Sequence, residues 1–136
     1  MKKKAKILNF DIHSDIDTKF DLVISSEVIE HIDEPWSFTA YCANMVKQEG
    51  DLIMTTLNRT LLSQVLAIEL AERWSGLLPP GTHDHDKFIS INEMIMDLRE
   101  VEFHVENLRG MNWNPFTNKW NWTNDVDCNY LVHAKR

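Results

Sequence analysis

Alternation of strand-like and helix-like segments constrains the fold of this chain more than any other feature. The apolar run from Asp21 to Ser26 is typical of a buried strand. Asp33-Glu34-Pro35 then opens a helix, with Asp33 as the expected N-cap and Gly50 as the expected end of the unit. A second strand-like run follows from Asp51 to Leu57. Strands that alternate with helices form parallel units, so the sequence predicts an α/β fold.

The remaining segments extend this pattern. Further strands are expected at 7–12, 103–108 and 129–135, with a loop at 112–127. Helices are expected at 59–78 and after the capping box formed by Ser90 and Glu93. No helix separates the last two strands, so they are expected to pair antiparallel. Because the chain shows no repeat and no linker, residues 1–136 are interpreted as one domain.

Composition excludes several classes of protein. The 136 residues are 43% hydrophobic and 26% charged, which is ordinary for a soluble globular chain. The net charge of -7 argues against general nucleic-acid binding, which needs a basic surface. Cys42 and Cys128 form no CxxC motif, so a reducing compartment and two core cysteines are expected. Neither a secretory signal nor an apolar run of membrane-spanning length is expected.

The polar segment directly after the first strand is the main candidate site. Glu27, Glu30 and His31 are spaced three and four residues apart, so on one helical turn they project to the same side. Two carboxylates and an imidazole suit Mg²⁺, and also Mn²⁺ or Zn²⁺. The carboxyl end of a strand is where open α/β sheets bind ligands. The alternative is that the acids only favour the positive end of a helix, and spacing leaves both interpretations open.

Three other features carry alternatives of their own. A loop with His83 and His85 is either a second metal site or a cover over a pocket. Residues 61–80 form either a buried helix or an apolar surface that touches a membrane. Three tryptophans near the C-terminus either line an apolar pocket or pack on a sheet: Trp113, Trp120 and Trp122.

Five ordered motifs together resemble a known family. They are Ser26-Glu-Val-Ile-Glu-His-Ile32, Thr55-Thr-Leu-Asn-Arg-Thr60, Gly81-Thr-His-Asp84 with Lys87-Phe88, Gly110-Met-Asn-Trp-Asn-Pro115 with Thr117 and Trp120, and Asn129-Tyr-Leu-Val-His-Ala134. From about Phe20 to Arg136 the chain resembles the C-terminal part of the ubiquinone-biosynthesis O-methyltransferases, which are class I S-adenosylmethionine (SAM) methyltransferases. The resemblance implies a partial Rossmann-like sheet, mostly parallel with an antiparallel last strand, whose N-terminal SAM-binding half is missing.

The resemblance also implies a reaction and its residues. The family transfers the methyl group of SAM to a phenolic oxygen of a polyprenylated catechol or demethylubiquinol. Glu27, Glu30 and His31 match the ligands of a magnesium ion, which would lower the pKa of the phenol and orient it. Ser26 matches a residue that lies against the adenosyl part of SAM. His83 also matches a family position and is the candidate general base.

Partners and location follow from the same resemblance. It implies a polyprenylated phenolic substrate, peripheral membrane contact through residues 61–80, and other proteins of ubiquinone synthesis as partners, but no nucleic acid. The expected location is the matrix side of the mitochondrial inner membrane, or the membrane periphery of the bacterial cytoplasm.

One departure from the family pattern bears on activity. SAM sites of this class use a glycine-rich turn between a strand and a helix, and none of the chain's four glycines lies in such a turn. The chain is therefore expected to be a fragment of a full enzyme, with an open sheet edge. The alternative function is a non-catalytic, methyltransferase-like module that binds metal, membrane or pathway proteins.

Overall fold

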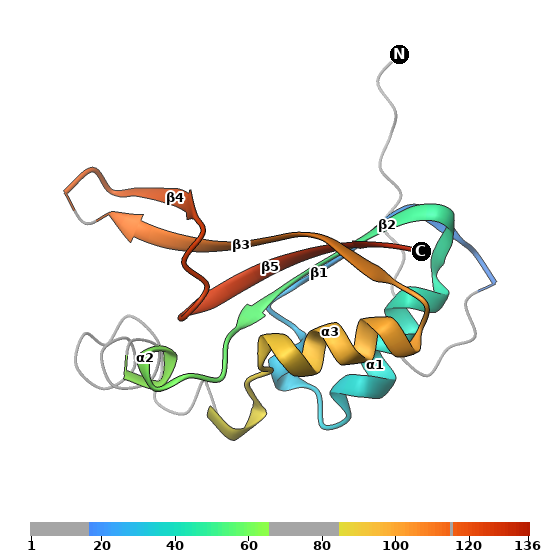
Figure 1. Cartoon of the computed structure of the whole chain (residues 1–136), viewed down its shortest axis with the longest axis horizontal. Helices are drawn as coiled ribbons and strands as arrows, with labels where there is room; N and C mark the ends of the chain where they lie inside the picture. The colour runs from blue at the N-terminus through green and yellow to red at the C-terminus, as the bar shows by residue number, and fades with distance from the viewer. Residues whose placement is uncertain (1–16, 66–84, 115) are drawn as a thin grey trace, which may run out of the picture.

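Among the residues that the structure describes, one five-stranded sheet carries the two longest helices packed on one of its faces (Figure 1). The structure, a computed structural model, describes residues 17–65, 85–114 and 116–136. The predicted strand at 7–12, most of the predicted helix at 59–78, and His83 lie outside these ranges. The elements, in chain order, are β1 (Phe20–Ser26), η1 (Ile29–His31), α1 (Pro35–Asn44), β2 (Val46–Leu57), α2 (Leu61–Ser63), η3 (His85–Lys87), α3 (Ile91–Glu100), β3 (His104–Asn114), β4 (Lys119–Thr123) and β5 (Asn129–Lys135).

The sheet has the strand order β1-β2-β5-β3-β4. β1 pairs parallel with β2, whereas β5 runs antiparallel to both of its neighbours, β2 and β3. β1, β2 and β3 therefore share one direction, and the last strand is inserted between two of them. This confirms the predicted α/β fold and its antiparallel last strand. β1 and β4 form the two edges.

The first helix begins differently from the prediction. Its N-cap is Glu34, whose side chain makes no capping hydrogen bond, and Pro35 takes the first helical position. Asp33 instead accepts a hydrogen bond from Lys87 Nζ at 2.7 Å. That ion pair ties the start of α1 to the segment that leads into α3.

Gly50 does not end a structural unit, because β2 already begins at Val46 and runs through it. A Cβ atom at Gly50 would lie 2.6 Å from Val46 Cγ1 and 3.1 Å from the carbonyl oxygen of Asp21 in β1. The glycine therefore permits a close approach of the two parallel strands, where the sequence suggested a helix terminus.

The predicted loop at 112–127 is wrong, because β3 continues to Asn114 and the chain returns as β4. The Asn114 side chain accepts hydrogen bonds from the backbone N–H groups of Phe116 at 2.9 Å and Thr117 at 3.2 Å. Such a bonded asparagine closes a tight turn. A segment rich in asparagine therefore forms a hairpin.

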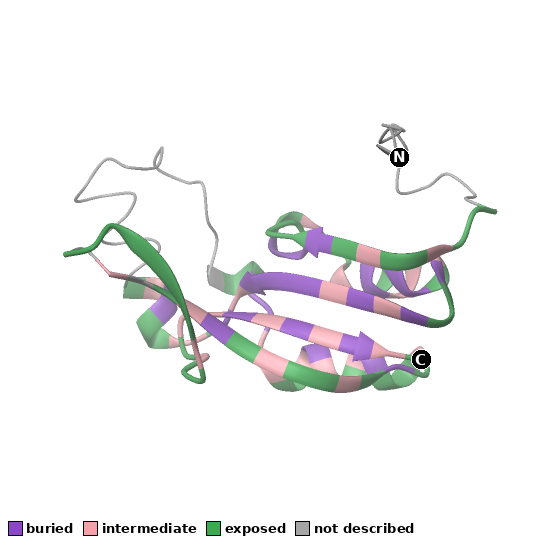
Figure 2. Cartoon of the chain, turned by 90° about the horizontal axis from the view of Figure 1, so that it is seen from above, coloured by how far each residue is buried: buried purple, intermediate pink, exposed green. Residues whose placement is uncertain are grey.

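The core lies between the sheet and the two helices. Side chains alternate along the strands, so every second residue of β5 is buried: Tyr130, Val132 and Ala134 (Figure 2). They pack with Leu52 and Met54 of β2 and with residues of α1 and α3 such as Phe38, Met94 and Leu98. The predicted capping box is confirmed: Glu93 Oε2 accepts from Ser90 N at 2.9 Å, and Ser90 Oγ accepts from Glu93 N.

The opposite face of the sheet is open among the described residues (Figures 1 and 2). On edge strand β1, Leu22 is 46% exposed and Ile24 is 61% exposed. Parallel sheets in α/β proteins are normally covered on both faces.

Candidate active site at the carboxyl ends of β1 and β2

Polar side chains gather where the two parallel strands end. Ser26, the last residue of β1, pairs with Thr55 of β2. The backbone N–H of Glu27 donates to the Thr55 carbonyl at 3.0 Å, which extends the pairing beyond β1. The backbone of Glu27 has φ of 51°, a left-handed conformation that residues other than glycine seldom adopt. Strained residues of this kind are concentrated at functional sites.

A chain of hydroxyl groups connects Ser26 to Glu27. Thr55 Oγ1 donates a hydrogen bond to Glu27 Oε1 at 2.8 Å and lies 3.1 Å from Ser26 Oγ. A hydroxyl group has one proton to donate, so Ser26 must be the donor to Thr55. Thr55 therefore fixes both the serine and the acid at the exposed end of β1.

Glu30 has a different environment. It is only 2% exposed, and its Oε2 accepts a hydrogen bond from Thr56 Oγ1 at 2.9 Å. Its other oxygen, Oε1, is buried without a hydrogen-bond partner among the described residues. Most buried polar atoms are hydrogen-bonded, so this oxygen is an exception that calls for an explanation.

The three predicted metal ligands do not lie on one helical turn. Glu27 precedes the helix, which begins only at Ile29 and is a single 3₁₀ turn. Thr55 and Thr56 are consecutive in β2 and point to opposite faces, so the acids that they bind are held on opposite faces. His31 is exposed and lines a pocket of about 550 Å³ with residues of α1.

These three residues are not gathered into a metal site in the observed arrangement. In the part of the chain that the structure describes, no three His, Cys, Asp or Glu residues lie together in a group that could hold one. The prediction that Glu27, Glu30 and His31 form a cluster assumed a regular helix directly after β1. The left-handed turn at Glu27 breaks that assumption.

A second hydrogen-bond network fixes the end of β2, and the sequence did not predict it. Asn58 donates from Nδ2 to the Val126 carbonyl at 2.9 Å and from its backbone N–H to the Cys128 carbonyl at 3.0 Å. Ser63 Oγ donates to the Asn58 carbonyl. The available signal was the motif of short polar residues from Thr55 to Thr60, directly after a strand. It anchors the loop before β5 against the candidate site.

Neither cysteine is set up as a nucleophile. Burial raises the pKa of the Cys42 thiol to about 12, and the residue is buried as predicted. Cys128 is half-buried, and its pKa is raised first by burial and then by the Asp125 and Glu27 carboxylates. Both thiols therefore stay protonated near neutral pH.

Two side chains of β5 lie beside Asp51 on the open face of the sheet. His133 Nε2 of β5 is 2.6 Å from Asp51 Oδ1 of β2, and Lys135 Nζ is 3.5 Å from the same oxygen. The hydrogen bond with His133 is the largest cause that lowers the pKa of Asp51. A lowered pKa in the folded state means that the carboxylate stabilises the fold above its unfolded pKa, and that this stability is lost as the pH falls through the folded pKa.

Asp51→Asn is therefore expected to lower the urea midpoint at pH 6, and the difference from the parent is expected to shrink as the pH falls through the lowered pKa of Asp51. Urea unfolding at a series of pH values between 6 and 2.5 measures the difference. Glu100→Gln, an exposed acid at the end of α3, serves as the control. A difference in urea midpoint between the parent and Asp51→Asn that stays constant with pH would contradict the lowered pKa of Asp51 in the folded state.

The fold defines a class. The solved magnesium protoporphyrin IX methyltransferase from Synechocystis PCC 6803 matches with a TM-score of 0.62 and 19% identity, covering 95% of this chain and 50% of that one. A possible histamine N-methyltransferase from Thermotoga maritima matches with a TM-score of 0.58 and 14% identity, covering 89% and 59%. A methyltransferase-domain family model matches residues 2–54. The chain therefore has part of the class I SAM-dependent methyltransferase fold.

Sequence relatives narrow this class. The ubiquinone biosynthesis O-methyltransferase of Parvibaculum lavamentivorans is 42% identical over 117 residues, which is 86% of this chain and 46% of that protein. The mitochondrial protein of that name from Rattus norvegicus is 40% identical over 117 residues, 86% of this chain and 34% of that protein. The chain is thus a relative of the ubiquinone biosynthesis O-methyltransferases, which confirms the resemblance carried by its motifs. It spans less than half the length of these two relatives.

Proposed function

We propose that this chain takes part in SAM-dependent methylation of a phenolic oxygen on an intermediate of ubiquinone synthesis. The observation that carries the proposal is about 40% identity, over 86% of the chain, to proteins named for that pathway and reaction type. The position of the Ser26–Glu27 segment at the carboxyl ends of β1 and β2 supports it, because ligands of such sheets bind there.

Ser26 is the proposed contact to the adenosyl part of SAM. Its side chain is exposed, and its Oγ keeps an acceptor site because it donates its proton to Thr55. Bound SAM supplies a methyl group on a positively charged sulfur. The role of this chain is to hold the cofactor and the phenol in line, a contribution of orientation. His83 as general base stays a prediction outside the described residues.

Magnesium binding by Glu27, Glu30 and His31 also stays a prediction from the family resemblance. Among the described residues, the buried Oε1 of Glu30, which has no hydrogen-bond partner, supports it. Because the three side chains are not gathered, the proposed reaction includes no step that depends on a metal.

Location and membrane contact are proposed on the same basis. The relatives include mitochondrial and bacterial proteins, so one of these two settings is proposed for this chain. The proposal also includes contact with the membrane through residues 61–80, which in a mitochondrion would be on the matrix side. It further includes contact with other pathway proteins. The helices within the described ranges include none that could span a lipid bilayer.

A chimaera tests the methyltransferase proposal. The region of the Parvibaculum lavamentivorans relative that matches this chain is replaced by the chain itself, and methyl transfer from radiolabelled SAM to a prenylated catechol is measured. Transfer is expected, and Ser26→Tyr should abolish it by filling the adenosyl site, whereas Ser37→Tyr at an exposed position of α1 should not. A folded chimaera that binds SAM without transferring methyl groups would overturn the proposal.

A second candidate is a non-catalytic module, and the open sheet face with Leu22 and Ile24 exposed favours it. In that case the chimaera transfers no methyl group, while the isolated chain still binds metal, membrane or pathway proteins. Micromolar SAM binding by the isolated chain in a calorimetric titration would instead refute the expectation that it is a fragment.

A further inference from the structure

The edge strand β1 has few of the features that protect an exposed sheet edge. Among the described residues it pairs only with β2, so its outer side offers backbone N–H and C=O groups to another strand. It is seven residues long, contains no proline, and has Asp21 as its only charged residue. Because Val23 packs against the core, Leu22 and Ile24 point to the open face, where they are 46% and 61% exposed. A long apolar edge of this kind is a template for strand pairing.

The sequence of β1 is complementary to itself when one copy is reversed. In an antiparallel pair of identical strands, a twofold axis at Val23 places Leu22 of each copy opposite Ile24 of the other, and both point to the open face. An axis at Ile24 would place Asp21 opposite Glu27, which is a pair of like charges. An axis at Leu22 would place Asp21 opposite the apolar Val23. Self-pairing therefore favours the axis at Val23.

The same register brings an acceptor to a buried polar atom. Ser25 is 6% exposed, and its Oγ has no hydrogen-bond partner among the described residues. With the axis at Val23, Asp21 of the second copy lies opposite Ser25 on the same side of the sheet. The side chain of Asp21 is 89% exposed, and beyond the bond that it accepts from Lys47 its carboxylate has further acceptor sites for a hydroxyl proton.

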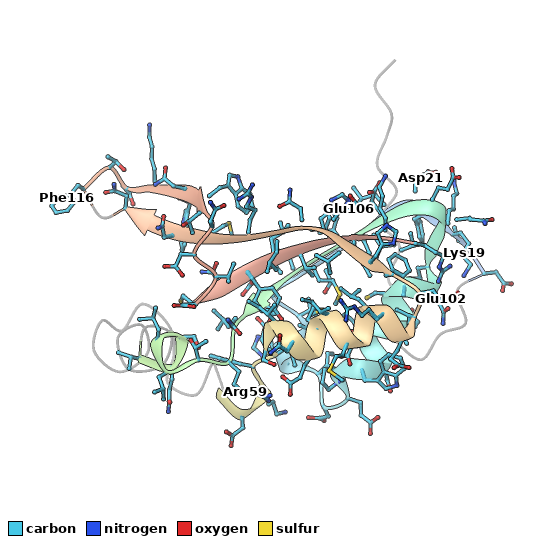
Figure 3. All side chains as sticks on the ribbon, in the orientation of Figure 1. Lys19, Asp21, Arg59, Glu102, Glu106 and Phe116 are labelled. Carbon is cyan, nitrogen blue, oxygen red and sulfur yellow. The ribbon has the colours of Figure 1, made fainter. Side chains whose placement is uncertain are left out.

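Charges at the two ends of β1 are complementary as well. Lys19 precedes the strand and Glu27 follows it, and both are exposed. Figure 3 shows Lys19 and Asp21 at the same end of the molecule. Antiparallel pairing brings this end of one copy to the end of the other copy that carries Glu27, so opposite charges meet at both ends of the contact.

We propose that two copies of this chain pair antiparallel through their β1 edges, with a twofold axis at Val23, and form one continuous sheet. Such a contact uses the same edge of both copies, so the assembly closes as a dimer. The contact of one strand with another is small, so the expected dissociation constant is about 1–100 µM. The inference concerns assembly and does not depend on methyl transfer.

Sedimentation velocity of the whole chain, from about 1 to 300 µM, tests the inference. The chain is expected to shift with concentration from the 15.9 kDa monomer to a dimer. Leu22→Lys/Ile24→Lys should raise the dissociation constant at least about tenfold, because each lysine would lie opposite another lysine. Leu61→Lys/Met96→Lys is the matched control, since it adds the same charge at exposed apolar positions of α2 and α3, and it should dimerise like the parent.

A charge-reversed variant tests the register. Leu22→Glu/Ile24→Glu should be monomeric by itself, and mixing it with an equal amount of Leu22→Lys/Ile24→Lys should restore dimers, because every lysine then lies opposite a glutamate. Circular dichroism checks that each variant is folded. In the parent, hydrogen exchange of the β1 amides should slow as the concentration rises, whereas exchange of the amides of β4, the other edge strand, should not change.

Four results would overturn the inference: a parent that stays monomeric throughout the concentration range, a lysine variant that dimerises like the parent, a mixture that contains no dimers, or assembly beyond the dimer. A fifth concerns a different occupant of the edge. If the part of the Parvibaculum lavamentivorans relative outside the matched region displaces the dimer and binds this chain, β1 pairs with that polypeptide and not with a second copy.

Discussion

Gly110→Ala is expected to destabilise this protein by at least about 3 kcal/mol, more than most single substitutions. A Cβ atom at Gly110 would lie 1.8 Å from the carbonyl oxygen of Asp125 and 2.9 Å from its carbonyl carbon. Both are backbone atoms, so no side-chain rotation can relieve the overlap. β3 and the loop before β5 would have to move apart.

The consequence reaches the candidate site. That loop offers the carbonyl groups of Val126 and Cys128 to Asn58, which anchors the end of β2. Displacing the loop leaves the nearly buried Asn58 without these partners, and an unpaired buried polar group adds its own penalty.

Urea unfolding measures the loss, and hydrogen exchange of the Asn58 amide reports whether the site loosens first. Asn112→Ala, an exposed residue two positions along the same strand, is the control and should change stability by less than about 0.5 kcal/mol. If the free energy of unfolding of Gly110→Ala lies within about 1 kcal/mol of that of the parent, the loop before β5 can adopt another position that avoids the overlap.

Local sequence signals predicted the elements whose causes are local. The apolar run from Asp21 to Ser26 corresponds to β1, and the alternation from Asn129 to Lys135 corresponds to β5. The Ser90–Glu93 capping box places the start of α3. These signals succeed because burial and capping act over a few neighbouring residues.

The hairpin and the turn after β1 could not be predicted in this way. Asn114 forms a turn only because β3 and β4 pair on either side of it. The amino-acid composition of this segment alone is typical of a loop. The left-handed conformation of Glu27 coincides with a backbone bond to Thr55, which is 28 residues away in the chain. A conformation that goes with a distant partner leaves no periodicity in the local sequence.

For the candidate site, the sequence located the polar residues but not their pairing. Glu27 and Glu30 were expected to act together, and the register of β1 against β2 assigns them to Thr55 and Thr56 instead. The bond from Asn58 to Val126 joins residues 68 positions apart, so it too depends on the assembled sheet. The motif from Thr55 to Thr60 marked the right segment without indicating its partners.

Thr56→Val should lower the free energy of unfolding by about 2–4 kcal/mol, whereas Thr55→Val should lower it by less than about 1 kcal/mol. The two substitutions are chemically identical and adjacent in β2, and each removes one hydroxyl group that donates to a glutamate. They differ in burial: Glu30 is 2% exposed and already has one unpaired oxygen, while the side chain of Glu27 reaches solvent. Water replaces the lost bond for Glu27 but has no access to Glu30.

Urea unfolding of both single variants tests the difference, and a double variant identifies its cause. Adding Glu30→Met to Thr56→Val should recover at least half of the lost stability, because replacing both partners with apolar groups removes the unpaired buried carboxyl group. No recovery would show that the loss comes from packing at Thr56. If Thr55→Val and Thr56→Val lower the free energy of unfolding equally, the two glutamates share one environment. The conclusion that Glu27 and Glu30 lie on opposite faces of β2 would then be wrong.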